Sequence, residues 1–189
     1  GKRAIADHFT SDSHFLGILR RDGKDEQAKE LKDFYRKIDV SSMMFLNQPE
    51  PKGFGDAVLR AKPFAWENFL VHAGDTYIIS PEHRHLIRLF KLHEELGADA
   101  TFIVQEVEDP RQYGVMEGKE VGENMYEVEK VMEKPEKPAT NLAIMPIYVF
   151  NPVIFKALEV TVQGKGGELQ LTDGIQKLIE WGLKVAAVK

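Results

Sequence analysis

Short apolar runs alternate with segments of helical spacing through the first two thirds of this chain. The apolar runs are Met43–Leu46, Asn68–Ala73 and Ala100–Val107, and the helical segments are residues 25–38, 54–62 and 80–96. The last helical segment opens on Ser80 and Pro81, an N-cap followed by proline at the first helical position, and should stop at Gly97. This alternation predicts an α/β fold, a mixed sheet with helices on both faces.

The pattern changes in the last third of the chain. Residues 113–150 read as short strands with glycine turns at Gly118 and Gly122, which predicts an antiparallel ribbon added to the sheet. Helices at 152–158 and 172–181 and a short strand at 184–188 should complete the fold. No internal repeat or low-complexity linker interrupts the chain.

Composition mainly excludes classes of partner. The 189 residues are 43% hydrophobic and 29% charged, which is typical of one globular domain. The formal net charge of -5 argues against a nucleic-acid partner, since such domains carry a basic stripe. There is no cysteine, so disulfides and thiolate metal sites are excluded, and no apolar stretch is long enough for a membrane span or a secretory signal. No membrane partner and a cytoplasmic location are therefore expected.

The segment from Gln48 to Ala57 joins a possible base-reading pair to the start of a helix. Gln48 follows an apolar run, so it would lie at the carboxyl end of a strand, where open α/β sheets bind ligands. Its amide offers a donor and an acceptor to the imide edge of uracil or thymine, and Gly53 adds an N–H that no Cβ shields. These features favour a Rossmann-like nucleotide-binding fold. An ordinary Pro/Gly loop that caps a helix remains the alternative.

Gly74, Asp75 and Thr76 directly follow a second apolar run. A carboxylate at this place can bind a hard cation such as Mg2+, which takes oxygen ligands and bridges phosphates. Aspartate after glycine is also a common turn residue, so the motif by itself leaves a structural role open.

Glu133 and Lys134 stand side by side at the end of a strand, before Pro135. In a regular strand their side chains point to opposite faces, but a twist or bulge before Pro135 would let both reach one ligand. Glu133 would then accept hydrogen bonds from sugar hydroxyls, and Lys134 would neutralise a phosphate. Neighbouring charged residues make an exposed charged hairpin the competing interpretation.

Taken together, these motifs resemble one family. They run in order through residues 1–9 and 51–59, the strand that leads to Asp75, and residues 113–115, 133–135, 141–144 and 167–173. This order is similar to that of the sugar-1-phosphate nucleotidylyltransferases, most closely the prokaryotic-type UTP–glucose-1-phosphate uridylyltransferases. Several linked motifs over nearly the whole chain are stronger evidence than any one of them.

The resemblance implies a reaction and a nucleotide site. The phosphate of glucose 1-phosphate would attack the α-phosphorus of UTP in line, giving UDP-glucose and pyrophosphate. Gln48 and Gly53 would bind the base, and Asp75 would be a catalytic ligand of the Mg2+ cofactor. Such a reaction needs positioning and charge neutralisation more than a proton shuttle, so no catalytic histidine is required.

The resemblance also implies a sugar-phosphate site. Gly114 would let the sugar lie against the backbone, and Glu133 and Asn141 would bind the sugar. Lys134 would be the catalytic cation that holds the phosphate of the sugar 1-phosphate. The expected partners are therefore a nucleoside triphosphate and a sugar 1-phosphate.

Some family features are expected outside this chain. A Gly-rich triphosphate loop with its strand would precede Gly1, and a second acidic metal ligand would follow Lys189. We therefore expect residues 1–189 to form a single nucleotidylyltransferase-like domain that lacks its first strand and Gly-rich loop. Thr76 and Pro146 also differ from the residues common in the family, and Pro146 weakens the case for sugar contacts there.

Several functions stay open at this stage. A glucose-1-phosphate thymidylyltransferase differs only in a methyl group on the base, which a pocket discriminates weakly. A non-catalytic nucleotide-sugar binding module, or a subunit completed by another chain, would fit the absent loop. A metal-dependent glycosyltransferase would need an Asp-x-Asp pair, which Asp75-Thr76-Tyr77 does not supply. A homo-oligomer also stays open, because residues 144–150 could serve a core or an interface.

Overall fold

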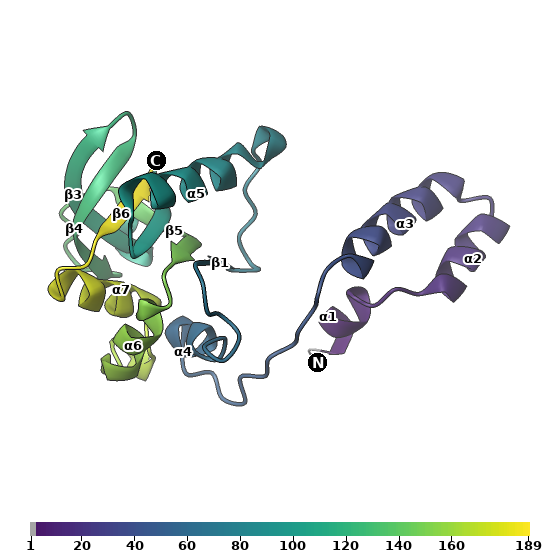
Figure 1. Ribbon diagram of the computed structural model, residues 1–189, viewed down its shortest axis with the longest axis horizontal. Helices are drawn as coiled ribbons and strands as arrows, with labels where there is room; N and C mark the ends of the chain where they lie inside the picture. The colour runs from purple at the N-terminus through teal and green to yellow at the C-terminus, as the bar shows by residue number, and fades with distance from the viewer. Residues whose placement is uncertain (1–2) are drawn as a thin grey trace. The chain divides into compact units, whose positions relative to one another are not determined.

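The computed structural model describes residues 3–189, apart from the side chain of Lys165 (Figure 1). Contacts divide the chain into two compact units, residues 1–47 and residues 48–189. All the β-strands in the described residues belong to the second unit.

The first unit is helical. It contains α1 (Arg3–His8), α2 (Ser13–Arg21) and α3 (Asp25–Asp39). Asp12 caps α2 by accepting a hydrogen bond of 3.0 Å from the backbone N–H of Phe15. Buried Leu19, Ala28 and Tyr35 come from α2 and α3, which pack on each other, so an amphipathic helical pair holds this unit together.

The strand predicted at Met43–Leu46 is wrong. These residues have no regular secondary structure, and their side chains are between 45% and 58% exposed. A strand needs a neighbour to pair its backbone N–H and C=O groups, and none of the described strands pairs with this segment. Apolar composition alone could not reveal the absence of a partner.

The second unit is built on a six-stranded mixed sheet. The strands are β1 (Phe69–His72), β2 (Ala100–Glu106), β3 (Gly114–Gly122), β4 (Met125–Glu133), β5 (Leu142–Phe150) and β6 (Val185–Val188). Their order is β1-β5-β2-β6-β4-β3, and only the β2–β6 pair is parallel. The predicted mixed α/β sheet is confirmed, as is the antiparallel ribbon, which is the β3–β4 pair.

Helices cover both faces of this sheet, as predicted (Figure 1). The helices of the unit are α4 (Phe54–Leu59), α5 (Arg84–Leu96), α6 (Val153–Val160) and α7 (Leu171–Glu180), with 3-10 turns η1 (Pro81–His83), η2 (Pro110–Gln112) and η3 (Lys165–Gly167). On one face, Ile154 of α6 and Ile175 of α7 pack with Phe102 and Phe150. On the other face, Leu89 of α5 packs with strand residues such as Ile147.

Two local predictions need correction. Gly118 does not form a turn, because it lies inside β3 at an irregularity of the β3–β4 register. A Cβ there would overlap the carbonyl oxygen of Glu127, so this glycine permits close strand approach, while Gly122 does end β3 at the hairpin turn. The helix predicted from Ser80 is regular only from Arg84, because Glu82 has a left-handed backbone that breaks it. It stops at Gly97, as predicted, with φ of 56°.

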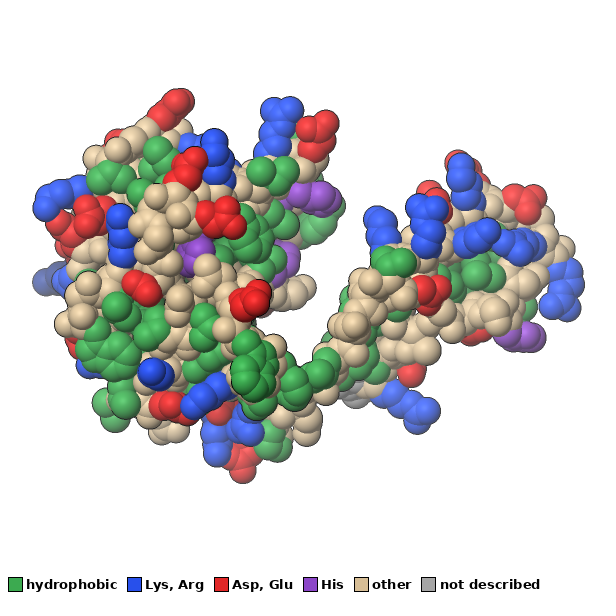
Figure 2. All heavy atoms as spheres, viewed as in Figure 1, with side chains coloured by type: hydrophobic (Ala, Val, Ile, Leu, Met, Phe, Trp, Pro, Cys, Tyr) green, Lys and Arg blue, Asp and Glu red, His purple; other side chains and the backbone are tan. Residues whose placement is uncertain are grey.

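Acidic and basic side chains are interspersed over the visible face of the second unit (Figure 2). None of the helices formed by the described residues combines the length and the apolar character required to cross a bilayer.

Candidate functional site

A cavity of about 530 Å3 lies in the second unit where several loops and strand ends meet. Four residues singled out from the sequence line it: Asp75, Gly114, Glu133 and Lys134. The other lining residues are Phe54, Ala73, Thr76, Gln112, Tyr113, Ile144, Pro146, Tyr148, Glu168, Gln170, Leu171 and Thr172. Its volume is in the range of sites for small ligands.

The backbone at the end of β4 places Glu133 and Lys134 on the same cavity. Lys134 has a φ of 42°, and its N–H donates to the carbonyl oxygen of Tyr113 at 3.0 Å. This turn of the chain breaks the strand alternation that would send the two side chains to opposite faces. The Lys134 Nζ lies 3.7 Å from the Glu133 Oε1, with the lysine half-exposed and the glutamate largely buried. The two side chains thus present a cation and an acceptor to one ligand space.

Thr172, at the start of α7, holds the Glu133 carboxylate in place. Its Oγ1 donates to the Glu133 Oε2 at 2.7 Å, and Thr172 itself is buried. Gly114 lies against the same pair, because a Cβ on it would stand 3.0 Å from the Thr172 Oγ1 and 3.3 Å from the Glu133 Oε2. The absence of a side chain at Gly114 therefore leaves the carboxylate accessible from the cavity.

We expect Thr172→Val to lower the free energy of unfolding by about 1–3 kcal/mol, because a largely buried carboxylate loses a hydrogen-bond donor. Thr172→Ser keeps the hydroxyl and should restore most of the stability. Urea denaturation of the three proteins measures this. Equal destabilisation by valine and serine would assign Thr172 to packing rather than to positioning Glu133.

Strand β5 lines the cavity with Ile144, Pro146 and Tyr148. Burial raises the pKa of the Tyr148 phenol well above its usual range, and the nearby Glu133 carboxylate raises it further. The carbonyl oxygen of Pro146 accepts a hydrogen bond of 3.0 Å from Ala73, which ties the loop bearing Asp75 to β5. Strand β5 therefore gives the cavity an apolar wall that carries a neutral phenol, in addition to the charged side chains of Glu133 and Lys134.

Gln48 and Gly53 do not line this cavity, but Gly53 directly precedes Phe54, which does. The Gln48 Nε2 donates to the Gly53 carbonyl oxygen at 3.0 Å and to the Asp56 Oδ2 at 2.8 Å. This second hydrogen bond is the main cause that lowers the pKa of Asp56. Both amide protons of Gln48 are thus in use, and its carbonyl oxygen is left as an acceptor.

Close backbone contacts join the Gln48–Gly53 loop to the segment before α7. The N–H of Leu169 donates to the carbonyl oxygen of Lys52 at 2.8 Å. The N–H of Gly55 donates to the carbonyl oxygen of Leu169 at 2.9 Å. Gly53 has a φ of 100°, and a Cβ on it would lie 2.6 Å from the Leu169 carbonyl oxygen. Only glycine fits both the backbone conformation and this approach.

Asp75 is an exposed carboxylate at the mouth of the cavity, in the loop after β1. The Thr76 hydroxyl donates to the Asp75 Oδ1 at 3.5 Å. Within residues 3–189, no group of three or more His, Asp or Glu side chains is arranged to hold a metal ion. A cation at Asp75 would therefore need further ligands beyond these side chains, such as water or a bound phosphate, which Mg2+ commonly takes.

Asn141 lies outside the cavity lining. It precedes β5, is exposed, and its carbonyl oxygen accepts a hydrogen bond of 3.1 Å from Val107. Thr172 and Tyr148, by contrast, line the cavity without having been assigned a role from the sequence. A signal for Thr172 was present, because it belongs to the motif at residues 167–173, while nothing in the sequence around Tyr148 distinguishes it from a core residue.

The nucleotidyl transferase family model matches residues 14–189. This chain belongs to that family. Among curated relatives of this chain, the UTP–glucose-1-phosphate uridylyltransferase of Staphylococcus haemolyticus is 35% identical over 182 residues, which are 94% of this chain and 62% of that protein. The enzyme of the same name from Staphylococcus epidermidis is 36% identical over 182 residues, which are again 94% of this chain and 62% of that protein. The chain thus spans slightly under two thirds of these relatives.

Solved structures agree with this assignment. A crystal structure of UDP-glucose pyrophosphorylase complexed with UDP-glucose is 27% identical, with a TM-score of 0.85, and the match covers 100% of this chain and 69% of that one. The UTP-bound UGPase from Acinetobacter baumannii is 25% identical, with a TM-score of 0.81, over 98% of this chain and 65% of that one. The α/β fold of this chain is therefore shared with these two solved structures.

Proposed function

We propose that this nucleotidyl transferase transfers UMP from UTP to glucose 1-phosphate. A phosphate oxygen of glucose 1-phosphate would form a bond to the α-phosphorus of UTP while the bond from that phosphorus to the bridging oxygen breaks, releasing pyrophosphate. The observation that carries the proposal is the meeting of Gly114, Glu133 and Lys134 around one cavity, next to the loop of Gln48 and Gly53. The names of the relatives support the same reaction.

In this proposal the loop before α4 binds uracil. The imide N–H of uracil would donate to the Gln48 carbonyl oxygen, and a uracil carbonyl would accept from the Gly53 N–H. Asp56 positions Gln48, because its carboxylate holds the amide nitrogen on the opposite side. Uracil and thymine share this edge, so the same contacts would accept dTTP.

The cavity would hold the sugar phosphate. Glu133, fixed by Thr172, would accept hydrogen bonds from glucose hydroxyls, and the sugar would lie over Gly114. Lys134 would neutralise the phosphate that attacks, so the two negatively charged reactants can approach. Positioning and charge neutralisation of this kind supply most of the catalysis in phosphoryl and nucleotidyl transfer.

Mg2+ would bind at Asp75 together with the phosphates of the nucleotide. An exposed carboxylate with room for water and phosphate oxygens fits this ion, which is typically held by one or two carboxylates and its substrate. When bound, the ion would supply charge neutralisation on the triphosphate.

The direct test mixes the protein with UTP, glucose 1-phosphate and Mg2+ and follows pyrophosphate release and UDP-glucose formation. Formation of both products at equal rates supports the transfer. Binding of UDP-glucose with no pyrophosphate released would instead favour a non-catalytic nucleotide-sugar binding module. Failure of both binding and product formation would contradict the proposal, and a higher rate with dTTP than with UTP would reassign the base.

Gln48→Ala tests the base contact. We expect the preference for UTP over CTP to fall about tenfold, because cytosine has an acceptor where uracil has the N–H that would donate to the Gln48 carbonyl oxygen. Competition binding of UTP and CTP to the variant and the unmodified protein measures this. An unchanged ratio would remove Gln48 from base recognition.

A further inference from the structure

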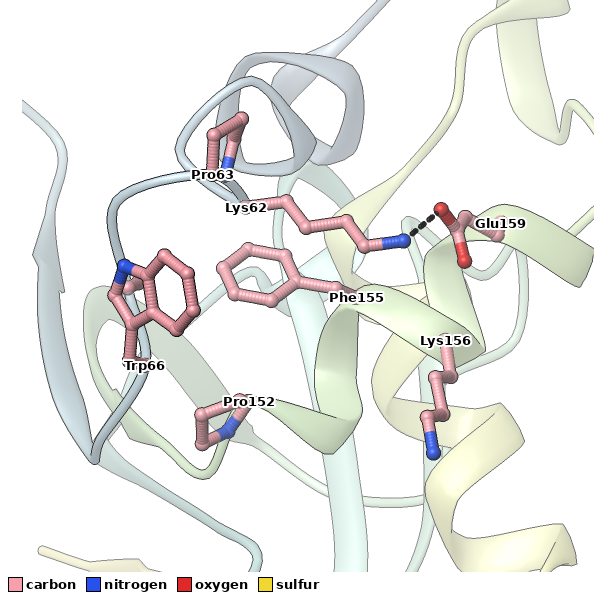
Figure 3. Close-up of a pocket in the computed structure, with 8 residues that line it drawn as sticks. Lys62, Pro63, Trp66, Pro152, Phe155, Lys156 and Glu159 are labelled. Atoms are coloured by element: carbon pink, nitrogen blue, oxygen red, sulfur yellow. Dashed lines mark hydrogen bonds and ion pairs between the residues drawn. The ribbon is translucent and has the colours of Figure 1, made fainter.

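A second cavity, of about 520 Å3, lies between the end of α4 and the start of α6 (Figure 3). It shares none of its lining residues with the first cavity. Its wall includes Lys62, Pro63, Trp66, Pro152, Phe155 and Lys156. The proposed transfer reaction assigns no role to this cavity.

Flat apolar rings form most of its wall. Figure 3 shows the Trp66 indole, the Phe155 ring and the Pro152 ring around the same space. Phe155 is fixed, because its ring stacks on Phe69 with centroids 5.0 Å apart and planes 3° apart. Trp66 is 83% exposed, so a large aromatic surface faces solvent beside a rigid ring. Such an arrangement suits a planar ring, since aromatic stacking adds to the gain from burial.

The charged side chains at the rim of the cavity indicate which charged group a ligand would carry. Lys62 is paired with Glu159, as the dashed line in Figure 3 marks. Lys156 projects beside the cavity, and within the described part of the chain it has no ion pair or hydrogen bond. The rim therefore carries one net positive charge, at Lys156. That charge matches a single anionic group, whereas a triphosphate would meet too little positive charge and the Glu159 carboxylate.

We propose that this cavity binds a planar aromatic monoanion. The ring lies against Trp66 and the two prolines, and the anionic group lies at Lys156. The site is separate from the proposed UTP and sugar-phosphate site, and its ligand chemistry is different: one aromatic ring system and one negative charge.

Titration calorimetry with 2-naphthoate tests the proposal, with its neutral counterpart 2-naphthamide as the matched ligand. We expect naphthoate to bind more tightly than naphthamide. Lys156→Gln should weaken naphthoate about fivefold and leave naphthamide unchanged, because only the anion uses the ammonium. Trp66→Ala should weaken both ligands about tenfold by removing the stacking surface. Lys32→Gln, at an exposed lysine in α3, is the control and should change neither.

Saturating UTP with glucose 1-phosphate should leave naphthoate affinity unchanged, which separates this site from the first cavity. Displacement of naphthoate by those substrates would overturn the proposal, as would equal affinity for the two naphthalene ligands. Sedimentation of the unmodified protein and of Trp66→Ala gives an independent check. If the unmodified protein is a dimer and Trp66→Ala is a monomer, this surface binds a second copy of the chain, which would contradict a small-molecule site. Melting temperatures of the variants, expected to be unchanged at these exposed positions, confirm that each one folds.

Discussion

Replacing Lys134 by alanine is expected to lower the affinity for glucose 1-phosphate about tenfold to one hundredfold while leaving the affinity for UTP within about twofold. The Lys134 ammonium lies at the cavity 3.7 Å from Glu133, where it can reach a sugar phosphate, and a charge-assisted hydrogen bond contributes about 1.5–3 kcal/mol. The loop that would hold the base is a separate element. Calorimetric titration of each ligand alone measures the two affinities.

Lys137 provides the matched control for this variant. It is an exposed lysine three residues further along the same loop, and it does not line the cavity. Lys137→Ala should leave both affinities unchanged, since it removes the same charge at a place where the ligand is out of reach. Equal losses of UTP and glucose 1-phosphate in Lys134→Ala would remove this residue from its assigned role.

Gly53→Ala is expected to be the most destabilising single methyl addition in the Gln48–Gly53 loop. The backbone φ of 100° is strained for any other residue, and the new Cβ would stand 2.6 Å from the Leu169 carbonyl oxygen. Backbone strain and overlap together should cost about 2–4 kcal/mol of unfolding free energy. Urea denaturation followed by tryptophan fluorescence reports on this part of the chain, because Trp66 and Trp181 both belong to the second unit.

Gly182→Ala separates the two causes. Gly182 also has a positive φ, of 73°, but a Cβ there meets nothing within 4 Å, so its substitution carries the backbone strain alone, about 1–2 kcal/mol. If Gly53→Ala costs no more than Gly182→Ala, the close approach to Leu169 does not constrain the loop. In buffer where Gly53→Ala remains folded, we further expect its UTP binding to be weakened, because the loop that presents the glycine N–H must shift.

The sequence was informative where local chemistry decides structure. Gly97 ends α5 because a left-handed residue there favours glycine, and this can be read without knowing the fold. A twist before Pro135 was one of two interpretations that the sequence left open, beside an exposed charged hairpin. The left-handed backbone at Lys134 is that twist, and it is held by a hydrogen bond to Tyr113, a residue distant in the sequence.

Features that depend on distant partners were not predictable. Met43–Leu46 has the composition of a strand, but composition does not say whether another strand lies beside it. Gly118 could not be distinguished from a turn glycine, because the carbonyl oxygen that it accommodates comes from the opposite strand at Glu127. The hydrogen bond from Thr172 to Glu133 likewise joins positions 39 residues apart, so only the folded chain reveals that Thr172 positions the carboxylate.

The measurement that tests the central claim most directly is a crystal structure of this protein with UDP-glucose. The account predicts uracil at Gln48 and Gly53, and glucose over Gly114 with its hydroxyls donating to Glu133. It also places the phosphate nearest the sugar within reach of the Lys134 ammonium. UDP-glucose bound elsewhere, for example between Trp66 and Phe155, with the first cavity empty, would contradict it.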